Sequence, residues 1–465
     1  MDYLKLSKLK SFLSIKYISV YTIMFVFAFC LITANSNKFW FNDNTTPFVH
    51  DSKMYYSYLP KFFIEQDIEY NNKQDYWLEP LPNGRHIMKF TCGVAILAAP
   101  FFLLAWAYSL IAGIPVDPYS QTFVEFVHYG DFLYLLLALI CIRKTLKHYK
   151  INEFAISICI LSVFFGTNLY YYILGQTFMS HGFLFSLHAI FIYLCVKFYN
   201  KINITNSILL ALVGGLITLI RPVEILCFLV WFIWDVSSFQ ELKTRILLLL
   251  SKWSYLLIML FTVILVFLPQ MLYWNLITGN YLVYSYASGE RLFFDDPKII
   301  GVLLGYKSGM FLYSPITIVY FICLLFVKFK NRISFLLFFI LTVYVVSCWW
   351  CWWYGGTYGM RALIQVYPYL IIPFGLFLNK LFESQIKWKV AVTTVVLLFI
   401  FSLSAFQIKN YSLLKKGFVH YDSMSKESYW FIFDKFDING DEAQMYYKML
   451  KSPDYNKAKL GERDF

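Results

Sequence analysis

Apolar segments separated by short polar loops run through almost the whole chain. A helix needs about 20 mostly apolar residues to cross the ~30 Å hydrocarbon core of a bilayer, whereas a transmembrane barrel would show short strands of alternating polarity. The pattern therefore predicts an all-α polytopic membrane protein with about 11–12 transmembrane helices. The apolar segments lie at residues 17–35, 91–113, 123–142, 154–172, 180–198, 206–220, 222–236, 247–272, 309–327, 333–349, 362–379 and 389–407.

Charged residues are scarce and make up 15% of the chain, against about a quarter in a soluble protein. The net charge is +12, but the cations stand mostly in the short loops, and no nucleic-acid-binding motif or basic face is evident. Nucleic acid is therefore excluded as a partner, and the cations are interpreted as signals of membrane topology.

Basic clusters follow every second apolar segment, so all of them fall on one side of the membrane, which the positive-inside rule makes cytoplasmic. The basic N-terminus belongs on that side too. We therefore expect a transmembrane domain at 1–407, which includes a first outer loop at 36–90, and an outer-face C-terminal tail at 408–465. The clusters are Arg143-Lys144, Lys197 with Lys201, Lys243 with Arg245, Lys328 with Lys330 and Arg332, and Lys380 with Lys387 and Lys389.

The segment 91–113 disturbs this regular alternation. An odd number of crossings must lead from the first outer loop to Arg143, yet two apolar segments lie between them. Because Gly93, Pro100 and Gly113 favour breaks, the segment is predicted to be re-entrant or to lie on the membrane surface, beside an active site. The alternative is an ordinary span followed by a basic loop on the outside.

Asp51 opens the polar part of the first outer loop, in His50-Asp51-Ser52. If this segment is helical, Asp51 shares one helix face with Tyr55 and Leu59. A carboxylate in this place can act as a general base or bind a divalent metal. The alternative is a plain carboxylate that caps the helix.

Two further polar residues stand at the edges of apolar segments. Lys89 precedes the segment at 91–113, where a cation can hold a lipid phosphate or serve as a snorkelling anchor. His181 begins the segment at 180–198, where it can bind a metal or a phosphate, although a lone histidine is more often structural.

Arg221 and Glu224 separate two apolar segments. Charges at that depth are costly unless they are used or paired, so the two residues either bind a ligand or form a salt bridge with each other on one helix. Glu290-Arg291 and Asp295-Asp296 are similar pairs, but they stand in a longer loop where exposed charge is ordinary.

A run of tryptophans leads into a glycine-rich turn and ends at Arg361. Trp353 can pack against a sugar ring, glycine allows close backbone approach, and arginine binds phosphate through two parallel N–H groups. The alternative is an interfacial aromatic belt. Cys348 and Cys351 flank two of these tryptophans and are interpreted as plain cysteines, because the nine cysteines give no disulfide framework.

Together these residues resemble the GT-C superfamily of membrane glycosyltransferases, which includes protein O-mannosyltransferases and the bacterial enzymes that add aminoarabinose to lipid A. The resemblance covers about residues 17–380. It rests on the carboxylate of Asp51, short juxtamembrane helices after it, the glycine-containing segment 89–95, and the polar turns at Arg221-Pro222 and 349–361.

The resemblance implies a GT-C-like bundle in the inner (plasma) membrane with its active site facing outward. The donor would be a polyprenyl-phosphate sugar and the acceptor a glycan, a lipid or a protein. Asp51 would be the general base or a metal-organising carboxylate, and Lys89, Arg221 and Arg361 would contact phosphate. Relatives often carry a second acid next to the first and another at a later span, where this chain has His50 and His181. A divalent metal (Mg or Mn) on Asp51 and His181 therefore stays an open expectation.

Two other functions fit the sequence less well. A lipid or polysaccharide transporter or flippase would often show internal repeats and helices broken at the bilayer midplane, whereas the polar residues here gather at one face. An O-antigen ligase or polymerase would rely on outer-face arginine and histidine rather than on a first-loop carboxylate.

Overall fold

The computed structural model describes residues 15–37, 48, 51–70, 78–176, 178–384 and 388–464. This part of the chain is almost entirely helical, with one small sheet in which β1 (Leu78–Pro80) pairs antiparallel with β2 (His86–Met88). Within it, 7 helical segments are long and apolar enough to cross a membrane, and shorter apolar helices cover the remaining apolar segments. The prediction of an all-α polytopic membrane protein is therefore confirmed.

Several helices begin at a polar residue whose side chain binds a free N–H group of the first turn. Asn152 accepts from the N–H of Ala155, and Asn203 from that of Asn206; such a cap is worth about 1 kcal/mol. The helical elements are η1 (Ile15–Tyr17), α2 (Ile18–Asn37), α3 (Asp51–Pro60), η2 (Lys61–Glu65), α4 (Gly93–Ala112), α5 (Gln121–His148), α6 (Glu153–Phe165), α7 (Leu169–Leu174), α8 (Ser180–Asn200), α9 (Ile204–Ile220), η3 (Pro222–Leu226), α10 (Cys227–Phe232), α11 (Phe239–Ser251), α12 (Trp253–Thr278), α13 (Ile299–Leu304), α14 (Met310–Tyr313), α15 (Ile316–Phe326), α16 (Arg332–Cys348), η4 (Arg361–Val366), α17 (Tyr367–Glu383), α18 (Lys389–Lys415), α19 (Lys426–Ile432), α20 (Gly440–Lys448) and α21 (Tyr455–Leu460).

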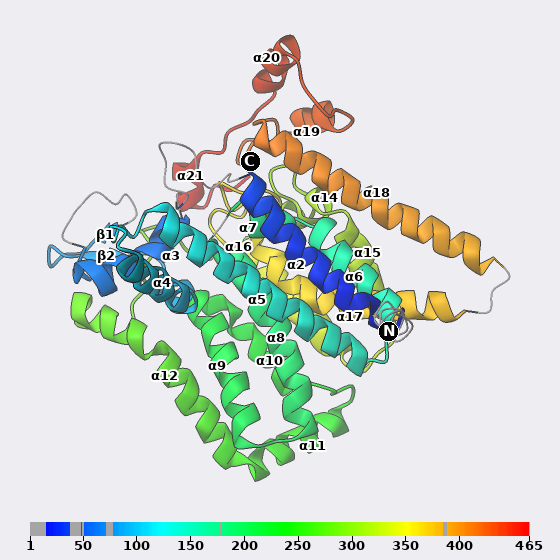
Figure 1. Ribbon diagram of the computed structural model, residues 1–465, viewed down its shortest axis with the longest axis horizontal. Coiled ribbons are helices and arrows are strands. Elements are labelled where there is room, and N and C mark those ends of the chain that lie inside the picture. Colours follow the sequence, from blue (N-terminus) through cyan, green and yellow to red (C-terminus); the bar gives the residue numbers. More distant parts are fainter. Residues whose placement is uncertain are drawn as a thin grey trace, which may run out of the picture.

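The helices alternate in direction along the bundle. Tyr129 in α5 donates a hydrogen bond to Asn35 near the end of α2 (2.7 Å), whereas Arg143 donates to Ser19 near the start of α2 (2.7 Å). Residues near the ends of α9, α12, α16 and α18 and at the starts of α8 and η4 line one cavity. We call this end of the bundle the site end. Helices α19, α20 and α21 lie beyond it, and α11 lies at the opposite end (Figure 1).

The segment predicted to be broken, 91–113, forms one continuous helix. Helix α4 contains Pro100 and ends at Gly113, whose φ of 65° is the left-handed conformation typical of a helix C-terminus. The expected re-entrant break is therefore wrong, because Gly93 stands at the first position of the helix and Pro100 stands inside it without ending it. Proline and glycine are tolerated in apolar helices where neighbouring groups satisfy the freed backbone. By length and composition alone, α4 is able to cross a membrane.

The contacts of α4 nevertheless place both of its ends near the site end. At its start, a Cβ on Gly93 would lie only 2.9 Å from the backbone nitrogen of Ile220, at the end of α9. After its end, the carbonyl of Pro118 accepts a hydrogen bond from Tyr56 in α3. The ring of Tyr56 packs 5.5 Å from that of Phe178, just before α8. This arrangement favours a surface-lying helix.

We expect labelling of single cysteines to place the loop after α4 on the outer face. Asp117→Cys should react with a membrane-impermeant maleimide from the same side as Pro82→Cys, and His148→Cys only after the membrane is permeabilised. The native background is low, because the native cysteines are buried except for the partly buried Cys141. Labelling of Asp117→Cys from the side opposite to Pro82→Cys would show that α4 crosses.

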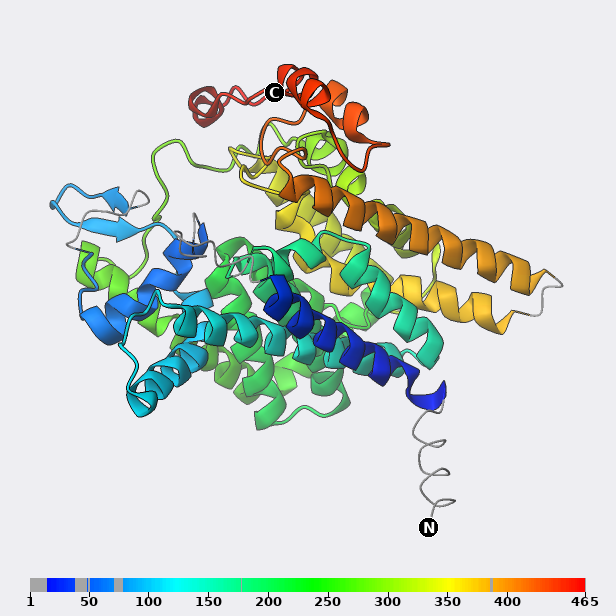
Figure 2. The same ribbon diagram turned by 45° about the horizontal axis from the view of Figure 1, so that its top comes forward.

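The C-terminal tail folds back over the site end, as its red helices show above the bundle (Figure 2). Helix α18 continues to Lys415, so the boundary expected at residue 407 falls inside a helix. Beyond it, the carbonyl of Tyr421 accepts a hydrogen bond from the N–H of Thr357 (3.1 Å). The hydroxyl of Tyr455 reaches Gly355, where a Cβ would lie 2.1 Å from it. The tail is thus packed against the glycine-rich turn before Arg361.

Candidate functional site

A cavity of about 1400 Å³ lies among the helix ends at the site end of the bundle. It is larger than the roughly 300–1000 Å³ of most small-molecule sites, so it has room for several sugar rings or a lipid head group. Its wall combines the start of α3, the segment before α4, the turns before α8 and after α9, the loop after α12, the turn between α16 and α17, and the tail.

This cavity brings together five of the seven residues that the sequence predicted as a site. Asp51, Lys89, His181, Arg221 and Arg361 all line it. The other two, Glu224 and Trp353, are not among the described residues that line it.

Asp51 and Arg361 form an ion pair across the cavity wall, with Arg361 Nη2 at 3.0 Å from Asp51 Oδ2. Asp51 is the first residue of α3, and Tyr55, one turn later, lines the same cavity, as the helical expectation requires. The two charged side chains are 21% and 11% exposed, respectively. The pair holds the carboxylate of Asp51 in one orientation within a largely desolvated place.

Nitrogen atoms beside this pair lack partners. Among the described residues, no hydrogen bond reaches the buried Arg361 Nε or His181 Nδ1. Arg221 has no acidic partner there either, and its guanidinium lies 5.6 Å from the centroid of the Tyr354 ring. Arg221 is half-buried, a cation held partly out of water is costly without an anion, and arginine binds phosphate through parallel N–H groups. This part of the cavity therefore suits a phosphate.

The charge of the whole cavity wall agrees with an anionic ligand. Six lysines and arginines line it, against two acidic residues. Tyrosines and tryptophans make up much of the remaining surface. The cations are Lys89, Arg221, Arg291, Arg361, Lys415 and Lys459, and the acids are Asp51 and Glu290.

Lys89 has a different environment from the one expected. Its Nζ lies 2.5 Å from Glu290 Oε2 and 5.4 Å from the centroid of the Tyr286 ring. Glu290 also pairs with Lys459 of the tail, at 3.4 Å. The charge of Lys89 is thus matched by Glu290, and we do not assign it a phosphate contact. Glu290 was missed because charge in a long loop is usually exposed, whereas its side chain is only 7% exposed.

We expect the pair of Lys89 and Glu290 to show strong coupling in a double-mutant cycle. Glu290→Gln should lower the free energy of unfolding by about 3–5 kcal/mol, because it leaves two lysines facing a neutral group. Lys89→Met should lower the free energy of unfolding by less, since Lys459 still contacts Glu290. The double variant should lose less than the sum of the two single losses. Thermal unfolding of the four proteins in one detergent tests this, and additive losses would contradict it.

Glu224 points away from the cavity and is 2% exposed. Its Oε1 accepts a hydrogen bond from Gln365 Nε2 (2.6 Å), and its Oε2 lies 3.4 Å from His188 Nε2. The expected salt bridge with Arg221 does not form among the described residues. The helix begins only at Pro222, while Arg221 is extended with a φ of −142°, so the two residues do not share a helix face.

Trp353 is fully buried and packs against Trp352 and Tyr455, with ring centroids 5.7 and 5.6 Å apart. It supports the wall, whereas Trp349 and Trp350 line the cavity itself. Cys348 and Cys351 are both free, and burial raises the pKa of the Cys351 thiol to about 12. A thiol with a raised pKa is a poor nucleophile, which agrees with plain cysteines.

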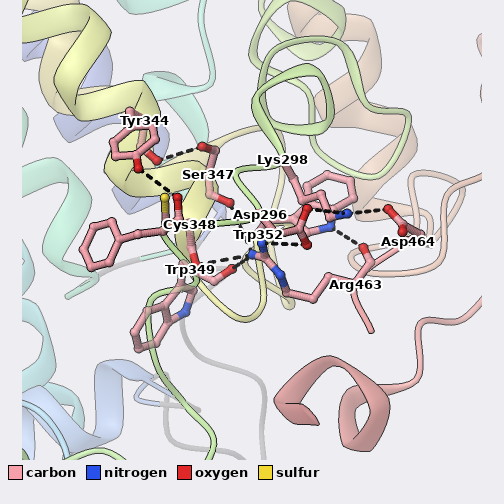
Figure 3. Close-up of polar contacts among 10 residues, drawn as sticks. Asp296, Lys298, Tyr344, Ser347, Cys348, Trp349, Trp352, Arg463 and Asp464 are labelled. Atoms are coloured by element: carbon pink, nitrogen blue, oxygen red, sulfur yellow. Dashed lines mark hydrogen bonds and ion pairs between the residues drawn. The ribbon is translucent and has the colours of Figure 1, made fainter. Parts of the chain in front are cut away.

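The tail is held in place by Arg463, whose side chain is buried with 0% exposure. Its Nη1 donates to the carbonyls of Ser347, Cys348 and Trp349 at 3.3, 3.3 and 2.9 Å, and its Nη2 lies 3.1 Å from Asp296 Oδ2. Figure 3 shows the guanidinium between these groups. The carbonyls at the C-terminus of a helix lack helical partners and carry partial negative charge. Together with the backbone N–H groups of Phe293 and Lys298, Arg463 therefore satisfies the end of α16, and it fixes the tail.

The divalent metal that the resemblance implied stays a prediction. Among the described residues, no group of three His, Cys, Asp or Glu side chains could hold a metal ion. The Oδ2 of Asp51 is bound by Arg361, and His50 lies outside the described residues. No chemical role is therefore assigned to a metal.

Comparison with known proteins assigns no family to this chain. No protein-family model matches this chain, and no curated protein matches it.

Proposed function

We propose that this chain is a membrane glycosyltransferase of the GT-C type, which moves a sugar from a polyprenyl-phosphate donor to an acceptor hydroxyl. The observation that carries the proposal is the ion pair of Asp51 and Arg361, which stands in a large cationic cavity beside nitrogen atoms without partners. A carboxylate next to an anion-binding group is what such a transfer needs: one group accepts a proton, and the other stabilises a leaving phosphate.

The outward orientation rests on the distribution of charge. Arg143 and Lys147 lie with Glu153 at the end of the bundle opposite the site end. Positive loops favour the cytoplasm, so the cavity would face outward from the inner (plasma) membrane. With α4 on the surface, about eleven crossings would lead from a cytoplasmic N-terminus to an outer tail.

In the proposed reaction, Asp51 takes the proton of the acceptor hydroxyl while that oxygen attacks the anomeric carbon. The new carbon–oxygen bond forms on the face opposite the leaving group, so the anomeric configuration inverts. The bond from the anomeric carbon to the phosphate oxygen breaks, and its electron pair leaves with the polyprenyl phosphate. Arg361 and Arg221 stabilise the charge that develops there. Arg361 uses Nη2 for Asp51 and keeps Nε unpartnered. One guanidinium is therefore able to orient the carboxylate of Asp51 and the leaving phosphate.

The proposal is tested by offering the purified protein, in lipid nanodiscs, a panel of polyprenyl-phosphate sugars together with envelope extracts as acceptors. We expect consumption of a donor and release of polyprenyl phosphate. The stereochemistry of the product reports inversion. If no donor is consumed while the reconstituted protein moves the same lipids between leaflets, the chain is a flippase and the proposal fails.

A further inference from the structure

The tail contributes a second chemical environment to the cavity. His420, Tyr421, Tyr447 and Tyr455 line it there. Tyr421 and Tyr447 are 56% and 54% exposed, so their rings are open to a ligand that arrives from water. A tyrosine offers a flat apolar face and a polar hydroxyl at its edge, which is suited to a ring that carries hydroxyl groups.

His420 is held as a neutral hydrogen-bond donor. Its Nδ1 accepts hydrogen bonds from the backbone N–H groups of Asp422 (3.2 Å) and Ser423 (3.0 Å). The neutral ring must then carry its proton on Nε2. Burial also lowers the pKa of His420, which keeps the ring uncharged near neutral pH.

The tail side of the cavity differs from the helix ends in its aromatic and hydroxyl groups. Lys459 lies 3.4 Å from Glu290 Oε1 and shares that carboxylate with Lys89, and among the described residues no acidic side chain of the tail lines the cavity. Arg361 Nε and His181 Nδ1, which have no hydrogen-bond partner among the described residues, lie near the helix ends. The cavity thus has a side suited to an anion at the helix ends and a tyrosine-rich side at the tail.

We propose that His420, Tyr421 and Tyr447 form a subsite for a glycan acceptor, an inference that rests on the proposed function. The tail lies over the site end of the bundle (Figure 2), so a donor that enters from the bilayer along the helix ends leaves the tail side of the cavity to the acceptor. The tyrosine rings stack on the apolar faces of sugar rings. The phenol groups and the Nε2–H of His420 bind sugar hydroxyls.

The test compares binding of two probes to the protein in lipid nanodiscs. One probe is a panel of neutral pentasaccharides, namely cellopentaose, maltopentaose, chitopentaose and mannopentaose. The other is undecaprenyl phosphate. The double variant Tyr421→Ala/Tyr447→Ala should bind its best pentasaccharide about tenfold more weakly, because both stacking rings are gone, and should bind undecaprenyl phosphate as the wild type does. The matched control is Phe436→Ala, a 77% exposed tail aromatic outside the cavity wall, which should bind both probes normally.

The outcomes separate this inference from the proposed function. If no pentasaccharide binds the wild type, if the double variant binds it equally well, or if only a serine-rich peptide depends on these tyrosines, the glycan subsite is overturned. Retained binding of undecaprenyl phosphate would in that case leave the proposed function standing. If undecaprenyl phosphate fails to bind while pentasaccharide binding depends on the two tyrosines, the subsite stands and the proposed donor is wrong.

Discussion

Replacement of Asp51 by asparagine is expected to reduce kcat for sugar transfer by about 10²–10⁴-fold, the usual contribution of a positioned general base. Asparagine keeps the shape of the side chain, and its carbonyl still accepts the hydrogen bond from Arg361 that the structure shows at 3.0 Å. The fold and donor binding should therefore change little. Initial rates in nanodiscs, with donor binding measured in parallel, distinguish a loss of chemistry from a loss of affinity.

The matched control for this experiment is Asp67→Asn. Asp67 belongs to the same loop and pairs with Lys61 at 3.3 Å, but it does not line the cavity. Its replacement should leave the transfer rate close to that of the wild type. Equal rates for Asp51→Asn and the wild type would remove Asp51 from the mechanism, and equal losses for both variants would point to a general effect on the loop.

The second large effect is expected at Arg463. Truncation of Arg463 to alanine removes its hydrogen bonds to Asp296 and to three helix-end carbonyls. Lys298 still pairs with Asp296, and backbone N–H groups still reach Ser347 and Cys348, so the carbonyl of Trp349 loses most. Hydrogen bonds to a charged group are worth about 1.5–3 kcal/mol each. The tail should therefore detach more often, and proteinase K should cut it about 30-fold faster or more. Sugar transfer should fall in the same variant, because Lys459 and the tail tyrosines leave the cavity with the tail.

Lys448→Ala provides the comparison for Arg463, since it removes an exposed cation from the tail without touching the cavity wall. Its proteolysis should match that of the wild type. Arg463→Lys should fall between the two, because lysine keeps the charge but not the fork of N–H groups. Unchanged proteolysis of Arg463→Ala would show that the tail is held by its apolar packing alone.

The fold was predictable where local hydropathy decides it. Each apolar segment became helical because the bilayer leaves backbone groups no other partners. The segment at 91–113 shows the limit of this reasoning. Its glycine and proline were interpreted as breaks, yet Pro100 stands inside a helix and Gly93 permits the close approach of Ile220.

The site was predictable in its residue types but not in its pairings. Asp51 and Arg361 were both singled out because each is a polar residue at the edge of an apolar segment, and the structure joins them. Lys89 and Glu224 have partners, Glu290 and Gln365, that lie at least 141 residues away along the chain. No local sequence pattern predicts such contacts. The tail was missed for the same reason, since nothing near Arg463 indicates that it will bind the end of α16.

The long separation between Asp51 and Arg361 also sets an order of assembly. Arg361 follows Asp51 by 310 residues, which at a synthesis rate of about 5–20 residues per second delays it by about 15–60 s. During that interval the nascent chain carries its carboxylate without its guanidinium partner, and the part of the cavity wall that runs from Arg361 to the tail does not yet exist. The proposed sugar transfer therefore has to wait until the segment that carries Arg361 has been synthesised and inserted.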